Sequence, residues 1–294
     1  MKKLNRKIRM LTQLLLLRIA SRVLPGPTGR YLARRFITPQ AGERSKAASA
    51  VSASSGVRTE TLTVGGTDIS TYQWGDPSCE PYVLLAHGWS SYALRFVEWI
   101  PMLRSMGYAV VSFDQPAHGA SSGKINHLPL FVEMIRQVGR HFGKPAVFIG
   151  HSMGASSVIF AQDEEWSPER FVLIAPFVAI SENASRQFET AGISPKAFPS
   201  FEAYLYSVTG RRFAEYEGAL RLPLMKGPAL IIHDRQDRET PWEKGARFAK
   251  LWPGARLFST EGLGHNRLLD HPSVINEVMN FIKPEKSSKA GLSE

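Results

Sequence analysis

Cysteine is almost absent from this 294-residue sequence, which contains only Cys79. A single thiol excludes a disulfide within the chain, so the fold must depend on packing and is compatible with a reducing compartment. The Cys and His residues also lack the spacing of zinc ligands, and we therefore expect no structural metal. Hydrophobic residues make up 43% of the chain, which is enough for a substantial core.

Acidic residues are nearly missing from one end of the chain. Residues 1–46 contain twelve Lys or Arg and one acid, Glu43, which gives a net charge of +11. The other residues hold 24 basic and 25 acidic side chains, a net charge of −1, within a total of +10. The basicity therefore belongs to an N-terminal arm, residues 1–46, and the neutral body gives no support for nucleic-acid binding.

The arm also lacks a long hydrophobic run. The apolar stretch Met10–Leu17 contains Gln13 and stops at Arg18, far short of the roughly 20 residues that a membrane span requires. Arg22 follows before any small-residue site at which a secretory signal would be cleaved. We therefore expect a cytoplasmic protein rather than a secreted one.

Apolar residues recur in the arm at helical spacing and are separated by basic residues. They are Ile8, Leu11, Leu15, Ile19 and Val23. The pattern predicts a basic amphipathic helix, which either lies peripherally on the inner, anionic face of a membrane or docks on the body by its leucines. A Ser/Ala-rich linker, residues 47–56, then leads to the body, residues 57–284, and a short tail, residues 285–294, follows it.

The body alternates between strand patterns and helix patterns. A hairpin pattern surrounds Gly65-Gly66, and continuous apolar runs follow at residues 82–88, 108–114, 146–152, 171–177, 229–234 and, more weakly, 255–260. Continuous runs are typical of strands that are covered on both faces, and helical spacing between them, as over residues 128–142, predicts an α/β fold with a largely parallel sheet.

One interval, at about residues 179–226, is too long for an ordinary connection between strands. It is rich in aromatic side chains, which are Phe188, Phe198, Phe201, Tyr204, Tyr206, Phe213 and Tyr216. We interpret it as a helical insertion that forms a lid, and its aromatic content suggests an apolar substrate group.

A serine framed by glycines follows one of the predicted buried strands, in "VFIGHSMGAS". Gly150 and Gly154 lie two residues before and after Ser152, so the strand and the next helix can approach closely around a sharp turn. The hydroxyl of Ser152 would then be exposed at the carboxyl edge of the sheet, where ligands bind in such folds. This pattern predicts a nucleophile.

A serine nucleophile needs a base, and the base needs a carboxylate that orients it. In this architecture the chain order is Ser, acid and then His. Asp237 lies in the loop after the apolar run at residues 229–234, and His265 lies in the glycine-rich loop after the next strand. We therefore predict that Ser152, Asp237 and His265 form a catalytic triad.

Each of these predicted residues has competitors nearby. Asp234 and Glu239 could replace Asp237 as the acid, but Asp234 lies closer to the strand end, where it could brace the turn. His271 precedes Pro272 and has the pattern of a helix start. His151 is interpreted as a packed residue of the turn rather than a catalytic one.

Two backbone N–H groups are predicted to stabilise an oxyanion. Met153 opens the helix after the nucleophile, and Trp89 follows the His87-Gly88 turn after an earlier strand. His118 is interpreted as structural, because it follows the strand that ends at Asp114 and would hold the next loop.

Five segments in this order, "AHGW", "FDQPAHGASSG", "GHSMGA", "IIHDRQD" and "GLGH", resemble the α/β-hydrolase superfamily over about residues 57–282. The resemblance implies an eight-stranded, mostly parallel sheet, a lid after the sixth strand, and metal-independent hydrolysis through an acyl-enzyme without a cofactor. It also implies the triad and oxyanion roles given above. Two positions depart from the family pattern, since Asp234 and Ala117 stand where glycine is usual.

The expected function is cleavage of a carboxylic ester of a small-molecule substrate, with a lipid-like or apolar acyl ester as one form. A carbon–carbon bond hydrolase or a thioesterase would use the same triad. A non-catalytic binding protein on the same scaffold is the alternative from another class, although it would have no chemical need for all three triad residues.

Overall fold

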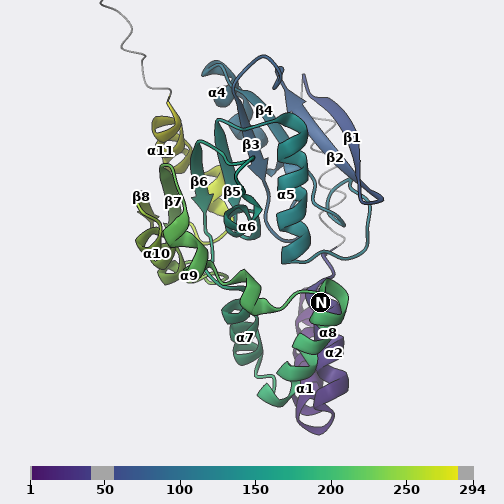
Figure 1. Ribbon diagram of the computed structural model, residues 1–294. Helices are drawn as coiled ribbons and strands as arrows, with labels where there is room; N and C mark the ends of the chain where they lie inside the picture. The colour runs from purple at the N-terminus through teal and green to yellow at the C-terminus, as the bar shows by residue number, and fades with distance from the viewer. Residues whose placement is uncertain (1, 41–55, 284–294) are drawn as a thin grey trace, which may run out of the picture.

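The computed structural model describes residues 2–40 and 56–283, with side chains from residue 8 onward. The predicted linker, residues 47–56, lies outside these ranges apart from Gly56, and the predicted tail, residues 285–294, lies outside them entirely. The described part of the body forms one sheet with helices on both faces (Figure 1).

The sheet has eight strands in the order β1-β2-β4-β3-β5-β6-β7-β8. The pairs β1–β2 and β2–β4 are antiparallel and the others are parallel, so the predicted mostly parallel α/β sheet is confirmed. The strands are β1 (Arg58–Val64), β2 (Thr67–Trp74), β3 (Tyr82–Ala86), β4 (Ala109–Phe113), β5 (Val147–His151), β6 (Arg170–Ile174), β7 (Ala229–Asp234) and β8 (Ala255–Thr260).

The central strands are buried because successive side chains enter two different cores. In β3, Leu84 and Ala86 join the core under α5 and α6, whereas Val83 and Leu85 join the core under α4 and α11. All four residues are fully buried. This arrangement explains why the strand reads as a continuous apolar run rather than an alternating one.

Helices and short 3-10 segments connect the strands. They are η1 (Ala93–Trp99), α4 (Ile100–Ser105), α5 (Leu128–Phe142), α6 (Met153–Ala161), α7 (Ile180–Ala191), η2 (Pro195–Ala197), α8 (Phe198–Thr209), η3 (Phe213–Tyr216), α9 (Gly218–Arg221), η4 (Leu222–Leu224), α10 (Trp242–Leu251), η5 (Arg267–Asp270) and α11 (Pro272–Ile282). Helix α5 spans the same residues whose helical spacing predicts it.

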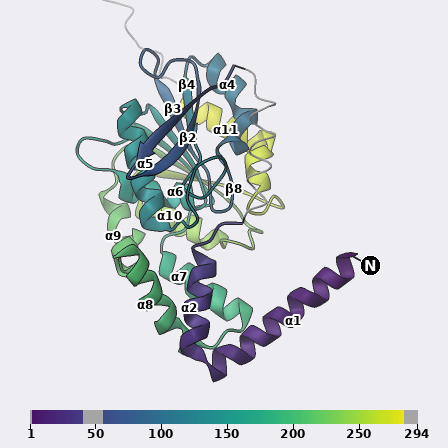
Figure 2. The ribbon, with the colours of Figure 1, turned by 90° about the vertical axis from the view of Figure 1, so that its right-hand side faces the viewer.

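The arm forms two helices, α1 (Lys2–Val23) and α2 (Pro25–Phe36), which lie beside α7 and α8 on one side of the sheet body (Figures 1 and 2). Only the first of them was expected from the sequence. Helix α2 approaches the insertion very closely, because a Cβ on Gly29 would lie 2.2 Å from the Ala197 carbonyl oxygen. The backbones are in contact there, and any residue with a side chain would force them apart.

A third apolar core joins α2 to the insertion, and we call it the arm–insertion cluster. Its buried members are Ala33, Ile37, Ala184, Phe188, Ile193, Ala197, Phe201 and Leu205. The Phe201 ring is at its centre, with ring centroids 5.3 Å from Phe36, 5.1 Å from Phe188 and 5.5 Å from Phe198. Several aromatic side chains of the insertion therefore pack within this cluster, and the apolar substrate group that they suggested stays a prediction.

Candidate active site

Ser152 occupies a strained turn between β5 and α6. Its φ of 52° and ψ of −117° lie in a region that non-glycine residues rarely adopt, at a cost on the order of 1–3 kcal/mol. The flanking glycines permit the turn, because a Cβ on Gly154 would lie 2.5 Å from the Ala86 carbonyl oxygen and one on Gly150 would lie 2.7 Å from the Ala155 Cα. The surrounding backbone therefore leaves space only for glycine, as the sequence pattern predicted.

His265 and Asp237 meet at the same edge of the sheet. His265 Nδ1 lies 2.7 Å from Asp237 Oδ2, and the Asp237 side chain is fully buried. The other carboxylate oxygen, Oδ1, accepts hydrogen bonds from the backbone N–H groups of Glu239 at 2.8 Å and Thr240 at 2.9 Å. The backbone of its own loop therefore orients the carboxylate independently of the imidazole.

A second histidine also contacts this carboxylate. His233, in β7, lies with Nε2 3.3 Å from Asp237 Oδ2 and 2.8 Å from the Thr240 carbonyl oxygen. Burial alone would raise the pKa of the Asp237 carboxyl, but the hydrogen bonds from His233 and His265 outweigh burial and hold this pKa well below its usual range. Asp237 is therefore ionised at neutral pH, so His265 donates through Nδ1 and its Nε2 is left to accept a proton.

Ser152 and His265 line one cavity of about 420 Å³. The lining residues are Gln40, Gly88, Trp89, Ser90, Ser91, Arg95, His151, Ser152, Glu239, His265 and Asn266. The structure thus brings the predicted nucleophile, base and Trp89 together, with Asp237 behind His265. Met153 is the first residue of α6, so its N–H has no acceptor within the helix.

The loop that carries Trp89 is held close to the nucleophile. A Cβ on Gly88 would lie 3.0 Å from the Ser152 Cβ. Ser90 adopts a φ of 52°, and its N–H donates to His118 Nε2 at 3.0 Å, while His118 Nδ1 lies 2.9 Å from the Pro116 carbonyl oxygen. His118 was expected to hold its own loop, and it also fixes the loop on which the predicted oxyanion donor lies.

His87 also supports the loop that carries Trp89. The Gln115 N–H donates to His87 Nε2 at 3.0 Å, which leaves Nδ1 to donate to the Gly88 carbonyl oxygen at 2.7 Å. Burial lowers the pKa of His87 to about 4, so its imidazole is neutral near pH 7 and this pattern of donor and acceptor persists.

The competing residues occupy structural positions. Asp234 accepts hydrogen bonds from the Thr260 hydroxyl at 2.7 Å and the Leu263 N–H at 2.9 Å, which brace the loop that carries His265. Glu239 is exposed at the cavity rim, where its carboxylate accepts a hydrogen bond from Asn266 at 2.9 Å. His271 is exposed at the start of α11 and pairs with Ser273 at 2.7 Å.

Sequence reasoning assigned no role in the site to Gln40, Ser90, Arg95 or His233. Gln40 comes from the arm, and its N–H donates to Ser90 Oγ at 3.1 Å. No sequence pattern connects these two positions, which are fifty residues apart. His233 could have been found, since it directly precedes Asp234 at the end of a predicted strand.

His151 lies beneath His265. Its Nε2 lies 3.0 Å from the His265 carbonyl oxygen, and the two rings have centroids 4.8 Å apart. Burial, followed by the nearby His265, lowers the pKa of His151 to about 3. A neutral His151 therefore donates to the His265 backbone, as expected for a packed residue of the turn.

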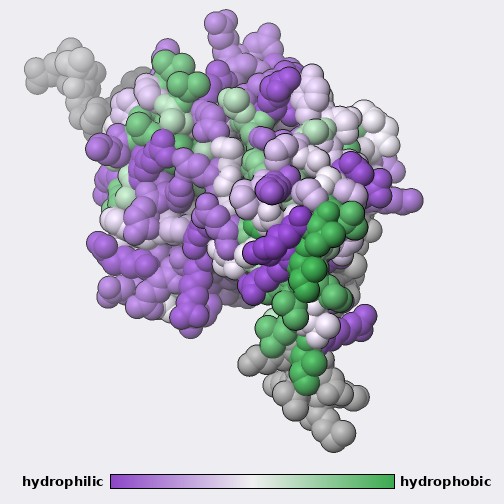
Figure 3. Space-filling model, turned by 90° about the horizontal axis from the view of Figure 1, so that it is seen from below, coloured by the Kyte–Doolittle hydropathy of each residue, from purple (hydrophilic) through white to green (hydrophobic). Residues whose placement is uncertain are grey.

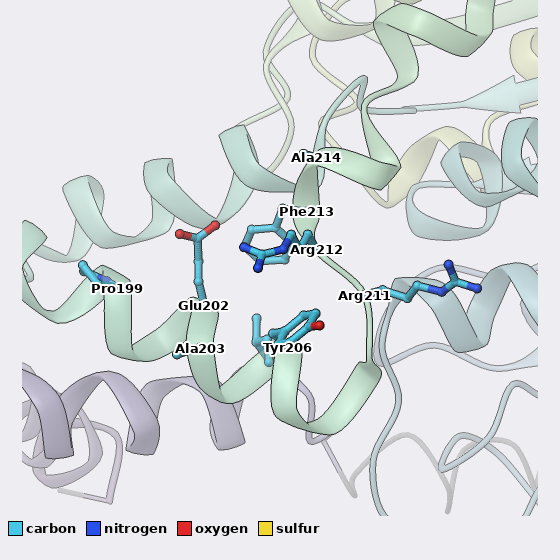
Figure 4. Close-up of a pocket in the computed structure, with 9 residues that line it drawn as sticks. Pro199, Glu202, Ala203, Tyr206, Arg211, Arg212, Phe213 and Ala214 are labelled. Carbon is cyan, nitrogen blue, oxygen red and sulfur yellow. The ribbon is translucent and has the colours of Figure 1, made fainter.

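A second cavity, of about 440 Å³, lies in the insertion rather than at Ser152 (Figure 4). Arg212 extends over the Tyr206 ring, with 5.0 Å from its Cζ to the ring centroid, while Arg211 points away and pairs with Glu215 at 2.9 Å. This cavity shares no lining residue with the one at Ser152. Among the described residues, no three His, Cys, Asp or Glu side chains are grouped so that they could bind a metal ion.

The family model described as the alpha/beta hydrolase family matches residues 83–278, which is more than half of the sequence. The chain therefore belongs to the alpha/beta hydrolase family, in agreement with the eight-stranded sheet and the turn at Ser152.

The relatives of this chain include lipases and uncharacterised hydrolases. It is 27% identical over 249 residues to the lysophosphatidylserine lipase ABHD12 of Rattus norvegicus, a match that covers 75% of this chain and 61% of the relative. It is 24% identical over 270 residues to the hydrolase YugF of Bacillus subtilis, with 76% and 97% covered. The chain spans between 42% and 62% of the length of the ABHD12 relatives.

A solved structure of a membrane phospholipase A has a TM-score of 0.59 to this chain at 18% identity. The likeness covers 94% of this chain and 98% of that one. Residues 56–283 alone make up a smaller share than 94%, so the matched region also includes residues of the N-terminal arm.

Proposed function

We propose that this protein hydrolyses carboxylic esters, with Ser152 as the nucleophile and His265 as the general base. The observation that carries the proposal is the 2.7 Å hydrogen bond from His265 to a buried, ionised Asp237. His265 and Ser152 line the same cavity. A nucleophile, a base and an orienting carboxylate form the minimal apparatus for acyl transfer.

In this mechanism His265 Nε2 removes the proton from the Ser152 hydroxyl as the oxygen attacks the ester carbonyl. The N–H groups of Trp89 and Met153 donate to the developing oxyanion, and Asp237 stabilises the imidazolium. The protonated His265 then gives its proton to the departing alcohol. A water molecule, deprotonated by the same nitrogen, finally cleaves the acyl-enzyme and releases the acid.

We propose a lipid-like ester as the substrate class, with an apolar acyl chain and a polar alcohol part. The cavity at Ser152 supports a polar alcohol part, since Ser90, Ser91 and Asn266 line it together with Arg95. The names of two similar proteins, a lysophosphatidylserine lipase and a membrane phospholipase A, agree with this class.

The test is hydrolysis of p-nitrophenyl esters of increasing acyl length, and of lysophosphatidylserine, without added metal. We expect Ser152→Ala to lose on the order of 10³-fold or more in kcat. Ser105→Ala, which removes an exposed hydroxyl from α4 outside the cavity, is the matched control and should stay within a few fold of wild type. A folded wild type that is inert on every ester, or whose activity survives Ser152→Ala, would contradict the proposal, and turnover of thioesters alone would change the substrate class.

A further inference from the structure

Helix α1 presents an apolar face that points away from the protein, and we call it the outer stripe. Its members are Ile8, Leu11, Leu15, Ile19 and Val23, each between 52% and 70% exposed. Figure 3 shows the apolar surface of this helix as a continuous band along one edge of the molecule, and Figure 2 shows α1 extending away from the body. An exposed apolar band of this extent is typical of a binding surface rather than of a solvated helix.

Other side chains of α1 fix the helix to the insertion. Arg18 Nε donates to the Ala191 carbonyl oxygen at 2.7 Å, and the fully buried Ser21 hydroxyl accepts from the Ser194 N–H at 3.0 Å. Rotating the helix to bury the outer stripe against the protein would break both hydrogen bonds. The stripe is therefore held outward by specific contacts.

The charge of the arm favours an anionic surface. Residues 1–46 carry a net charge of +11, and Arg9 and Arg22 are exposed on the same helix as the outer stripe. An apolar band bordered by cations matches a bilayer with anionic headgroups, where each nearby Lys or Arg contributes about 1 kcal/mol. A second copy of this chain would bring its own +11 arm and would be repelled.

The helix is suited to lie in the plane of the bilayer surface. Within residues 2–40 and 56–283, none of the helices combines the length and hydropathy needed to cross a bilayer. In α1 the five residues of the outer stripe instead lie within a sector of about 120°, as in helices that enter only the boundary between headgroups and acyl chains.

The arm also continues into the active site. After α2, the Ile37 carbonyl oxygen accepts from the Asn126 N–H at 2.8 Å, and Gln40 donates to Ser90 and lines the cavity of Ser152. Helices α1, α2, α7 and α8 all lie on one side of the sheet body (Figures 1 and 2). Contact of α1 with a surface would therefore place this side of the molecule, and not the opposite one, next to it.

We propose that the outer stripe of α1 binds the surface of an anionic lipid bilayer. The apolar side chains enter the boundary below the headgroups, and the arginines remain at headgroup level. This binding does not depend on the proposed esterase activity, although it would deliver lipid esters to the cavity at Ser152.

The test is flotation of the 294-residue chain with vesicles, using the Ser152→Ala variant so that no lipid is consumed. We expect binding to vesicles of phosphatidylcholine with 30% phosphatidylglycerol to be at least about 10-fold tighter than to phosphatidylcholine alone, and to weaken at high salt. Leu15→Glu with Ile19→Glu should weaken it at least about 10-fold.

The matched control is Leu220→Glu with Leu224→Glu, which changes two leucines that are 73% and 70% exposed in the insertion. It adds the same charge and should leave binding within about twofold of the parent. A Leu15→Trp variant, which keeps the stripe apolar, should show a blue shift of its fluorescence with anionic vesicles.

Three results would overturn the proposal. They are equal binding to neutral and anionic vesicles, equal losses in the two double variants, and no binding while the stripe variants convert a dimer into a monomer in analytical ultracentrifugation. The last result would identify the stripe as an interface between copies of this chain. Vesicle binding is measured without turnover, so its failure is distinguishable from failure of the esterase proposal.

Discussion

The carboxyl edge of the sheet and the arm–insertion cluster are both built from buried residues, but different kinds of interaction hold them together. At the sheet edge several strands end in or just before a polar residue, and His87, His118 and His233 each hold a neighbouring loop in place. In the arm–insertion cluster, aromatic rings around Phe201 join two segments that are more than 150 residues apart in the chain. The first region positions chemical groups with directional hydrogen bonds, and the second uses non-directional packing to hold the arm.

Asp237→Asn should give the largest effect on catalysis. The amide cannot replace the carboxylate that holds the His265 tautomer, so we expect kcat to fall by about 10⁴-fold. Glu239→Gln is the matched control, because Glu239 lies at the cavity rim and should change kcat by less than a few fold. Equal losses in both variants, measured by steady-state kinetics, would show that the acid had been misassigned.

Phe201→Ala should destabilise the arm–insertion cluster more than the sheet. Removal of a buried aromatic ring costs about 3–5 kcal/mol, and here the loss falls on contacts with Phe36, Phe188 and Phe198. We expect hydrogen exchange to accelerate in α2 and α8 while the amides of β3 and β5 stay protected. If all of these amides lost protection together, the two regions would form one cooperative unit and the comparison would fail.

His151→Gln should reduce the loss of stability in acid. The pKa of His151 is lowered to about 3 in the folded protein, so between pH 6.5 and pH 3 the unfolded chain binds a proton that the folded protein does not. The free energy of unfolding therefore decreases as the pH is lowered through this range. We expect wild type to lose about 2 kcal/mol more than the variant between pH 7 and pH 5, as measured by urea unfolding. The glutamine amide retains a donor for the His265 carbonyl oxygen. Parallel curves for the two proteins would exclude His151 as a source of acid sensitivity.

Ser90→Ala should give the smallest effect and tests the link between the two regions. It removes the hydroxyl that accepts from the Gln40 N–H, at a cost of about 1 kcal/mol, while the Ser90 backbone bond to His118 is retained. We expect a modest rise in KM with kcat nearly unchanged, since Gln40 lines the cavity. A fall in kcat of more than about 10-fold would mean that the arm fixes the oxyanion loop itself.

Much of the sheet could be predicted because its signals are local. Each strand from β3 to β8 is a short apolar run, and the glycines around Ser152 mark a turn that no other residue fits. The loop positions of Asp237 and His265 follow from the strand ends, since parallel strands end at one edge. The participation of Gln40 could not be predicted in this way, because its partner Ser90 is distant in the chain.

The sequence by itself determined the fold class, the candidate nucleophile and the basicity of the arm, since composition, spacing and glycine placement depend only on neighbouring residues. Only the tertiary structure decided where the aromatic residues of the insertion go, which face of α1 stays exposed and which imidazole contacts which carboxylate. These outcomes depend on packing between distant segments, as at Gly29 against Ala197, and on hydrogen bonds whose partners are chosen only when the chain is folded.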